Sequence, residues 1–139
     1  MNSFGFALLA ASLWGVAPVF ARMGLAKADP LLALTVRSSV ITAILWVVVT
    51  VSGRLNQLFA IAPRSAGFIA MEGVTASLLG HLALYWALKT GEASVVTPVT
   101  SAYPIITIIL AAVFLGEQLT VAKILGTAIV LAGLYVIRM

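Results

Sequence analysis

Hydrophobic positions fill five long stretches of the chain, and short polar breaks separate one stretch from the next. Crossing about 30 Å of hydrocarbon at about 1.5 Å of rise per residue takes about 20 residues of helix. Each stretch comes close to that length, so the pattern predicts an all-α integral membrane protein with five transmembrane helices. The predicted spans cover residues 4–21, 30–52, 66–88, 93–115 and 119–137.

Four polar breaks connect these spans, and they carry the Pro, Gly and charged residues typical of helix ends and loops. The link over residues 53–65 is the longest, and we expect its apolar stretch, 58–61, to lie in the membrane interface. Residues 1–21 carry no charged side chain and therefore lack the positive region of a secretory signal. We expect this segment to be retained as the first span.

The composition agrees with a lipid environment. Hydrophobic residues make up 63% of the chain and charged residues 9%, whereas a water-soluble surface needs far more charge. A length of 139 residues predicts one domain, 1–139, with no room for a separate soluble one. The net charge of +4 comes from single Lys and Arg residues near helix ends, which favours membrane lipid headgroups as partners and not nucleic acid.

Patterns of catalytic and metal-binding residues are missing from the sequence. It holds no cysteine and one histidine, too few ligands for a zinc site. It also lacks a nucleophile elbow, a phosphate loop and paired catalytic carboxylates. We therefore expect neither an enzyme nor a cofactor or metal.

An odd number of spans places the two termini on opposite sides of the membrane. The cations expected on the N-terminal side are Arg54, Arg64 and Lys123, and those on the C-terminal side are Arg22, Lys27, Lys89, Arg138 and a snorkelling Arg37. This excess mildly favours a cytoplasmic C-terminal side. It is small enough to permit insertion in both orientations.

Arg37 and Glu72 lie about seven residues inside predicted spans, and a charge at the bilayer centre costs roughly 2.5–3.5 kcal/mol on insertion scales. Arg37 lies about 10 Å deep, and it either has a functional role or reaches back to the headgroups. Glu72 has a shorter side chain and needs a partner or a wet cavity, which makes it the best candidate for proton coupling. The alternative is a protonated carboxyl that only ties helices together.

His81 follows Glu72 by nine residues. At roughly 100° per residue in an α-helix, the two side chains should point to opposite faces and not form a pair. His81 should share its face with Ser77, Leu84 and Tyr85. A functional histidine and a histidine that only satisfies a local hydrogen bond are both compatible with this position.

The fourth span contains two prolines, Pro98 and Pro104, among several hydroxyl residues that include Ser101. Prolines leave backbone carbonyls without a partner, and membrane helices tolerate this where protein or a wet cavity supplies one, as at transporter substrate sites. A bend relieved by neighbouring hydroxyls is the alternative. Tyr103 and Trp14 lie near mid-depth, which suggests an aromatic cavity wall or simple packing.

The fifth span carries Gly126 and Gly133 seven residues apart on one face, with Ala122 one turn before Gly126. Such a stripe of small residues permits close contact between helices. We interpret it as a packing or dimerisation surface.

Taken together, these features resemble the EamA domain of the drug/metabolite transporter superfamily along essentially the whole chain. The resemblance rests on two groups of residues. The first comprises Leu13-Trp14-Gly15, Pro30 and Arg37, and the second comprises Ala87-Leu88, Gly91, Ala93, Pro98, Tyr103-Pro104, Leu115-Gly116-Glu117, Gly126 and Gly133.

Members of this family commonly contain two such units, so the resemblance implies that one unit works as a homodimer or with a separately encoded half. Two oppositely inserted copies would restore the inverted two-unit architecture, and Glu72 of one copy would then lie at about the depth of Arg37 of the other. The resemblance also implies a small-molecule cavity lined by Trp14, His81, Tyr85, Ser101 and Tyr103. Glu117 is expected to cap the last span, where a carboxylate suits the positive helix end.

The resulting interpretation is a secondary transporter in the plasma membrane that works by alternating access and is coupled to protons through Glu72. Export of small metabolites or drug-like solutes is preferred on family grounds. The alternative is a non-transporting scaffold, or an accessory subunit of a larger transporter or flippase.

Overall fold

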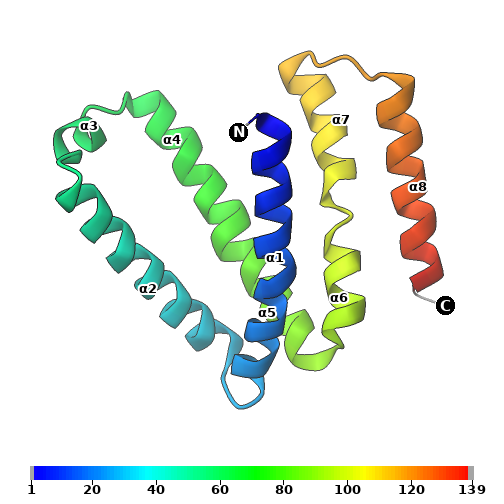
Figure 1. Ribbon diagram of the computed structural model, residues 1–139, viewed down its shortest axis with the longest axis horizontal. Coiled ribbons are helices and arrows are strands. Elements are labelled where there is room, and N and C mark those ends of the chain that lie inside the picture. Colours follow the sequence, from blue (N-terminus) through cyan, green and yellow to red (C-terminus); the bar gives the residue numbers. More distant parts are fainter. Residues whose placement is uncertain (1, 138–139) are drawn as a thin grey trace. The chain divides into compact units, whose positions relative to one another are not determined.

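The computed structural model describes residues 2–137, and all regular structure in that range is helical (Figure 1). Arg138, which entered the charge comparison, lies outside the described residues. The helices are α1 (Ser3–Leu25), α2 (Pro30–Val51), α3 (Leu55–Phe59), α4 (Pro63–Glu72), the π-helix η1 (Gly73–Gly80), α5 (His81–Thr90), α6 (Ala93–Thr100), α7 (Tyr103–Leu115) and α8 (Val121–Ile137).

Four helical segments of the described chain are long and apolar enough to cross a membrane: Ser3–Leu25, Pro30–Val51, Pro63–Thr90 and Ala93–Leu115. The fifth predicted span appears as α8, which has 17 residues and so lies at the short end of the spanning range. The expected all-α fold class is confirmed. The third span starts earlier than predicted because Pro63 opens α4, and the apolar link before it contains the short helix α3.

Local sequence signals explain where several helices begin and end. Asp29 caps α2, because its Oδ1 accepts hydrogen bonds from the Leu31 amide at 2.9 Å and the Leu32 amide at 3.3 Å. Pro30 follows at the first helical position, where a missing N–H does no harm. Gly116 ends α7 with φ at +67°, a left-handed conformation that favours glycine.

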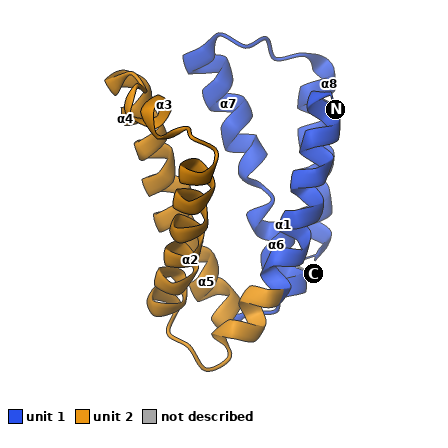
Figure 2. Ribbon diagram, turned by 60° about the vertical axis from the view of Figure 1, so that its left-hand side comes forward, with its two compact units in different colours: residues 1–19, 91–139 blue, residues 20–90 orange. Residues whose placement is uncertain are grey.

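Two compact units divide the chain (Figure 2). Unit 1 contains residues 1–19 and 91–139, and unit 2 contains Phe20–Thr90. The helix α1 begins in unit 1 and ends in unit 2. Within unit 1, α6 contacts α8, and within unit 2, α2 contacts α5.

Side-chain cations tie one end of unit 2 together. Arg22 donates hydrogen bonds to the backbone carbonyls of Leu88 and Lys89 at the end of α5. Lys89 in turn donates to the carbonyl of Ala28, in the link between α1 and α2, at 3.0 Å. Cations suit the last carbonyls of a helix, because the helix dipole is negative there.

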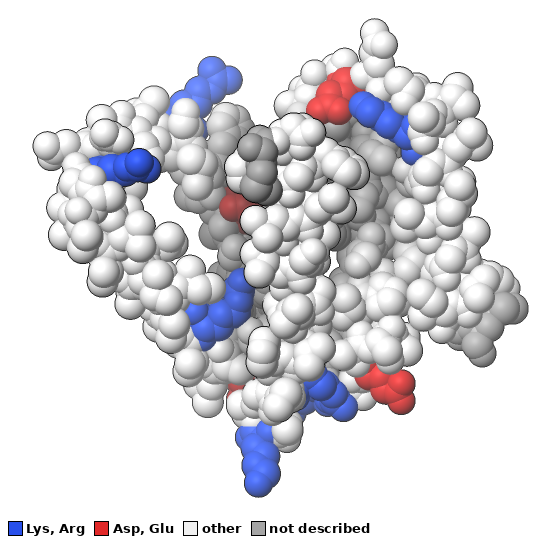
Figure 3. Space-filling model, in the orientation of Figure 1, with Lys and Arg blue, Asp and Glu red and all other residues white. Residues whose placement is uncertain are grey.

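The described chain buries few of its large apolar side chains. The buried hydrophobic residues are Leu25, Leu34, Tyr85 and Leu88, all in unit 2, whereas Trp14 is 63% exposed and Phe114 78% exposed. In the space-filling view, Lys, Arg, Asp and Glu cover little of the surface (Figure 3). An apolar surface of this extent requires lipid or another protein against it.

Candidate functional site

The third span changes its helical geometry between Glu72 and His81. Residues Gly73–Gly80 form η1, in which backbone bonds join residue i to residue i+5. Each residue of a π-helix turns through a smaller angle than in an α-helix, and the difference accumulates over eight residues. The expectation that Glu72 and His81 lie on opposite faces is therefore wrong, because it assumed 100° per residue throughout.

Two side chains hold the π-helix in place. The Thr75 hydroxyl donates to the carbonyls of Met71 at 2.9 Å and Glu72 at 3.2 Å. The His81 Nδ1 lies 2.9 Å from the Ala76 carbonyl oxygen. Since a carbonyl only accepts, Nδ1 carries the proton and a neutral ring leaves Nε2 as an acceptor. His81 thus makes the local hydrogen bond that its alternative interpretation proposed, while Nε2 stays available to a ligand.

The aromatic part of the predicted cavity in unit 2 consists of His81 and Tyr85. Their ring centroids lie 6.5 Å apart at an interplanar angle of 74°, an edge-to-face contact. His81 is half-buried, but Tyr85 is only 8% exposed. Tyr85 therefore offers a solute little surface and acts mainly as a support for the His81 ring.

The other predicted cavity residues, Trp14, Ser101 and Tyr103, belong to unit 1, and all three are exposed. Trp14 lies on α1, one turn before Pro18. A proline at that position cannot donate to the Trp14 carbonyl, which leaves a polar backbone atom beside the indole. Sequence analysis missed Pro18, although its place inside an apolar stretch was a sufficient signal.

The fourth span is interrupted between its two prolines. Helix α6 ends at Thr100 and α7 begins at Tyr103. The hydroxyls of Thr100 and Ser101 both donate to the Thr97 carbonyl, at 2.8 Å and 2.9 Å. These hydroxyls close the end of α6, and none of them reaches the Thr100 carbonyl that Pro104 leaves without its helical donor. The gating role of Pro98 and Pro104 stays a prediction.

Within residues 2–137, Arg37 and Glu72 do not pair with each other. The ion pair found in that range joins Lys123 and Glu117, whose atoms lie 3.3 Å apart. Arg37 is half-buried on α2, and Glu72 is exposed at the end of α4. Both charges thus lack an ionic partner in the described part of a single copy.

Glu117 does not cap α8 as expected. The Lys123 amide instead donates to Thr120 Oγ1 at 3.3 Å, while the Glu117 carboxylate accepts from the Lys123 ammonium. Thr120 is closer along the chain to the first turn, so its short side chain reaches the free amide. The ion pair between Glu117 and Lys123 therefore joins the link after α7 to the first turn of α8.

The glycine stripe on α8 is open. A methyl group added at Gly126 or Gly133 would meet no other heavy atom within 4 Å. Within unit 1, no other described helix is therefore packed against these two positions. The packing or dimerisation role predicted for the stripe stays a prediction.

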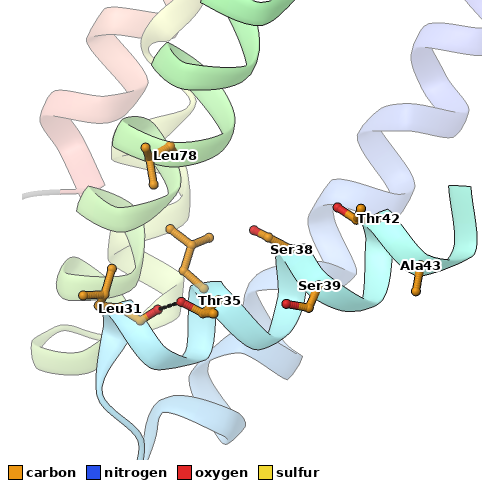
Figure 4. A pocket seen from close by; sticks show the side chains of 8 residues that line it. Leu31, Thr35, Ser38, Ser39, Thr42, Ala43 and Leu78 are labelled. Carbon is orange, nitrogen blue, oxygen red and sulfur yellow. Dashed lines mark hydrogen bonds between the residues drawn. The ribbon is translucent and has the colours of Figure 1, made fainter. Parts of the chain in front are cut away.

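A groove of about 550 Å³ runs along α2 in unit 2 and faces Leu78 of η1 (Figure 4). Sequence analysis missed it. Four hydroxyl residues of α2 line it at spacings of three, four and seven, which places them on one helix face. The four residues are Thr35, Ser38, Ser39 and Thr42. Their spacing in the sequence was a sufficient signal for a polar face on this helix.

Among residues 2–137, no group of three or more His, Cys, Asp and Glu side chains could hold a metal ion. Unit 2 contains the π-helix, the histidine that holds it, Glu72 and the hydroxyl-lined groove. They suit the binding of a small organic solute inside a membrane.

Comparison with known proteins gives a consistent result. Residues 2–139 match the family described as the EamA-like transporter family. An uncharacterised transporter from the cobO 3′ region of a Sinorhizobium species is 32% identical over 128 residues, which are 92% of this chain and 90% of that protein. An uncharacterised protein of Methanocaldococcus jannaschii is 30% identical over 135 residues, 91% of this chain and 89% of that protein.

A further relative is longer. An uncharacterised transporter of Archaeoglobus fulgidus is 30% identical over 71 residues, which are 51% of this chain but 26% of that protein. No solved structure matches the chain.

Proposed function

Because the chain belongs to the EamA-like transporter family and is thus a multi-pass membrane transporter of the drug/metabolite transporter superfamily, we propose that it exports small metabolites or drug-like solutes across the plasma membrane by alternating access. The observation that carries this proposal is the family match over residues 2–139. A relative that is named as a transporter, and that aligns over 92% of this chain and 90% of its own length, supports it. The spans supply the mid-membrane polar groups that solute binding requires.

The proposed working form is a homodimer. Two relatives match over about nine-tenths of both chains, so a unit of this size recurs. The exposed apolar surface and the open stripe at Gly126 and Gly133 support a second copy as the missing neighbour. The small difference in cations between the two sides supports an inverted arrangement.

Coupling is proposed to pass through Glu72. Its carboxylate is exposed, lies in a span and has no ionic partner in the described chain. A charge so placed needs water, a proton or a cation from outside. Two arrangements would meet that need. Glu72 could bind a proton in exchange for the solute, or it could form an ion pair with Arg37 of a second copy.

Solute flux tests the function. Purified protein is reconstituted into liposomes loaded with a labelled mixture of amino acids, nucleosides and neutral glycosides. Loss of label faster than from protein-free vesicles is expected. If the purified protein moves no label and instead retains a different membrane protein on purification, the scaffold or accessory-subunit alternative replaces this proposal.

Orientation tests the inverted dimer. The chain has no cysteine, so Asn2→Cys and Met139→Cys each provide one thiol for an impermeant reagent applied to intact and opened cells. About half of each terminus should react from outside, since the cation bias is weak. Reaction at one terminus alone would exclude the inverted dimer and leave a parallel assembly or an oppositely oriented partner.

A further inference from the structure

The groove along α2 has the composition of a binding site. Its eight lining residues comprise four hydroxyl side chains and four apolar side chains, and none is ionisable. The hydroxyls project from one face of α2, and Leu78 of η1 lies on the opposite wall (Figure 4). A solute in this groove would meet hydrogen-bonding groups along one edge and hydrocarbon along the other.

Several hydroxyls of the described helices find a hydrogen-bond acceptor within their own helix. Ser12, Thr50 and Thr127 each donate to the carbonyl one turn back. In the groove, Thr35 does the same, to Leu31 at 2.9 Å. Ser38, Ser39 and Thr42 make no hydrogen bond through their side chains within residues 2–137.

A hydroxyl that faces hydrocarbon without a hydrogen-bond partner raises the free energy of the protein, and the costs of three neighbouring hydroxyls add. Their partners must come from whatever fills the groove. Its volume of about 550 Å³ falls in the usual range for small-molecule sites, which is roughly 300–1,000 Å³. A charged solute would lose its hydration here without gaining a counter-charge, because the lining has none.

We propose that this groove binds an uncharged amphiphilic solute that carries several hydroxyl or amide groups along one edge. The proposal rests on the transporter function and names the class of substrate and its contact surface on α2. The hydroxyls of Ser38, Ser39 and Thr42 bind the polar edge, and Leu31, Ala43 and Leu78 contact the apolar part.

Thiol labelling tests the site in the full-length protein in liposomes. Ser39→Cys places a thiol in the groove. Val40→Cys is the matched control at nearly the same depth, because residue 40 does not line the groove and is exposed on another part of the helix. A maleimide reacts with the thiolate, which forms in water and is suppressed in apolar surroundings. Ser39→Cys should react roughly tenfold faster than Val40→Cys.

Protection tests the solute class. Phenyl β-D-glucoside is the uncharged probe, and phenyl β-D-glucuronide is its charged counterpart of similar shape. The glucoside should slow labelling of Ser39→Cys several-fold and the glucuronide should not. Thr42→Cys provides a second groove position with the same expectation.

Each other outcome overturns the proposal. Equally slow labelling of the groove and control thiols means that protein, such as a helix of a second copy, covers the groove. Rapid labelling without protection by the glucoside, or with equal protection by the glucuronide, contradicts the uncharged solute class. Flux through the unmodified protein is measured in parallel, so failure of the groove with intact flux leaves the transporter function standing.

Discussion

Glu72 is an exposed carboxylate at the end of α4, inside a continuous apolar helix that runs from Pro63 to Thr90. If it exchanges protons with the solute, Glu72→Gln removes the exchange but keeps the size and polarity of the side chain. Flux driven by a pH gradient is then expected to fall about tenfold or more, since a general proton-transfer group commonly contributes at least that much. Flux is measured in liposomes with and without the gradient.

Glu92→Gln is the matched control, because Glu92 is exposed in the short link before α6. It should leave gradient-driven flux unchanged. If Glu72→Gln transports as well as the unmodified protein under the gradient, proton coupling through this residue is excluded.

At the scale of the element, the π-helix η1 is the distinctive feature, and two glycines probe it. A methyl group at Gly80 would lie 3.2 Å from the Thr75 carbonyl oxygen, whereas one at Gly73 would meet nothing within 4 Å. Both substitutions by alanine gain the same helix propensity. Gly80→Ala alone crowds the backbone, and it should be less stable than Gly73→Ala by about 1 kcal/mol.

Thermal unfolding of the two variants in detergent gives the comparison. Equal melting temperatures would mean that the backbone at Thr75 yields freely and that the π-helix has no fixed packing. His81→Phe extends the test, because it keeps an aromatic ring beside Tyr85 but removes the donor to Ala76. It should be less stable than Tyr85→Phe, which keeps that donor.

At the scale of the whole molecule, the two unpaired charges of the spans point to assembly. If Arg37 of one copy pairs with Glu72 of another, Arg37→Glu or Glu72→Arg alone should weaken the dimer about tenfold or more, since breaking a desolvated charge pair costs about 2–5 kcal/mol. The double exchange should restore it. Energy transfer between labelled copies in liposomes measures the dimer fraction across dilutions.

Arg64→Glu is the control for a change of charge alone, because Arg64 is exposed in the first turn of α4. It should leave the dimer fraction unchanged. A double exchange that remains as weak as the single variants would show that Arg37 and Glu72 do not meet.

Local chemistry explains why much of the fold could be predicted from the sequence. The start of α2 follows from Asp29 and Pro30, and the end of α7 follows from Gly116, because capping and turn geometry depend on neighbours in the chain. The apolar stretches follow from the thickness of the bilayer alone. In the candidate site, the break between α6 and α7 could be predicted because Pro98 and Pro104 disturb the helix locally.

What the sequence by itself determined is therefore the class of protein, the number of apolar helices and the family, since each depends on length, hydropathy and residues in fixed local order. Only the tertiary structure decided the π-helix between Glu72 and His81, the burial of Tyr85 and the groove beside Leu78. These depend on which carbonyl a side chain reaches and which helix lies opposite. Such contacts join positions whose separation the hydrophobic pattern does not encode.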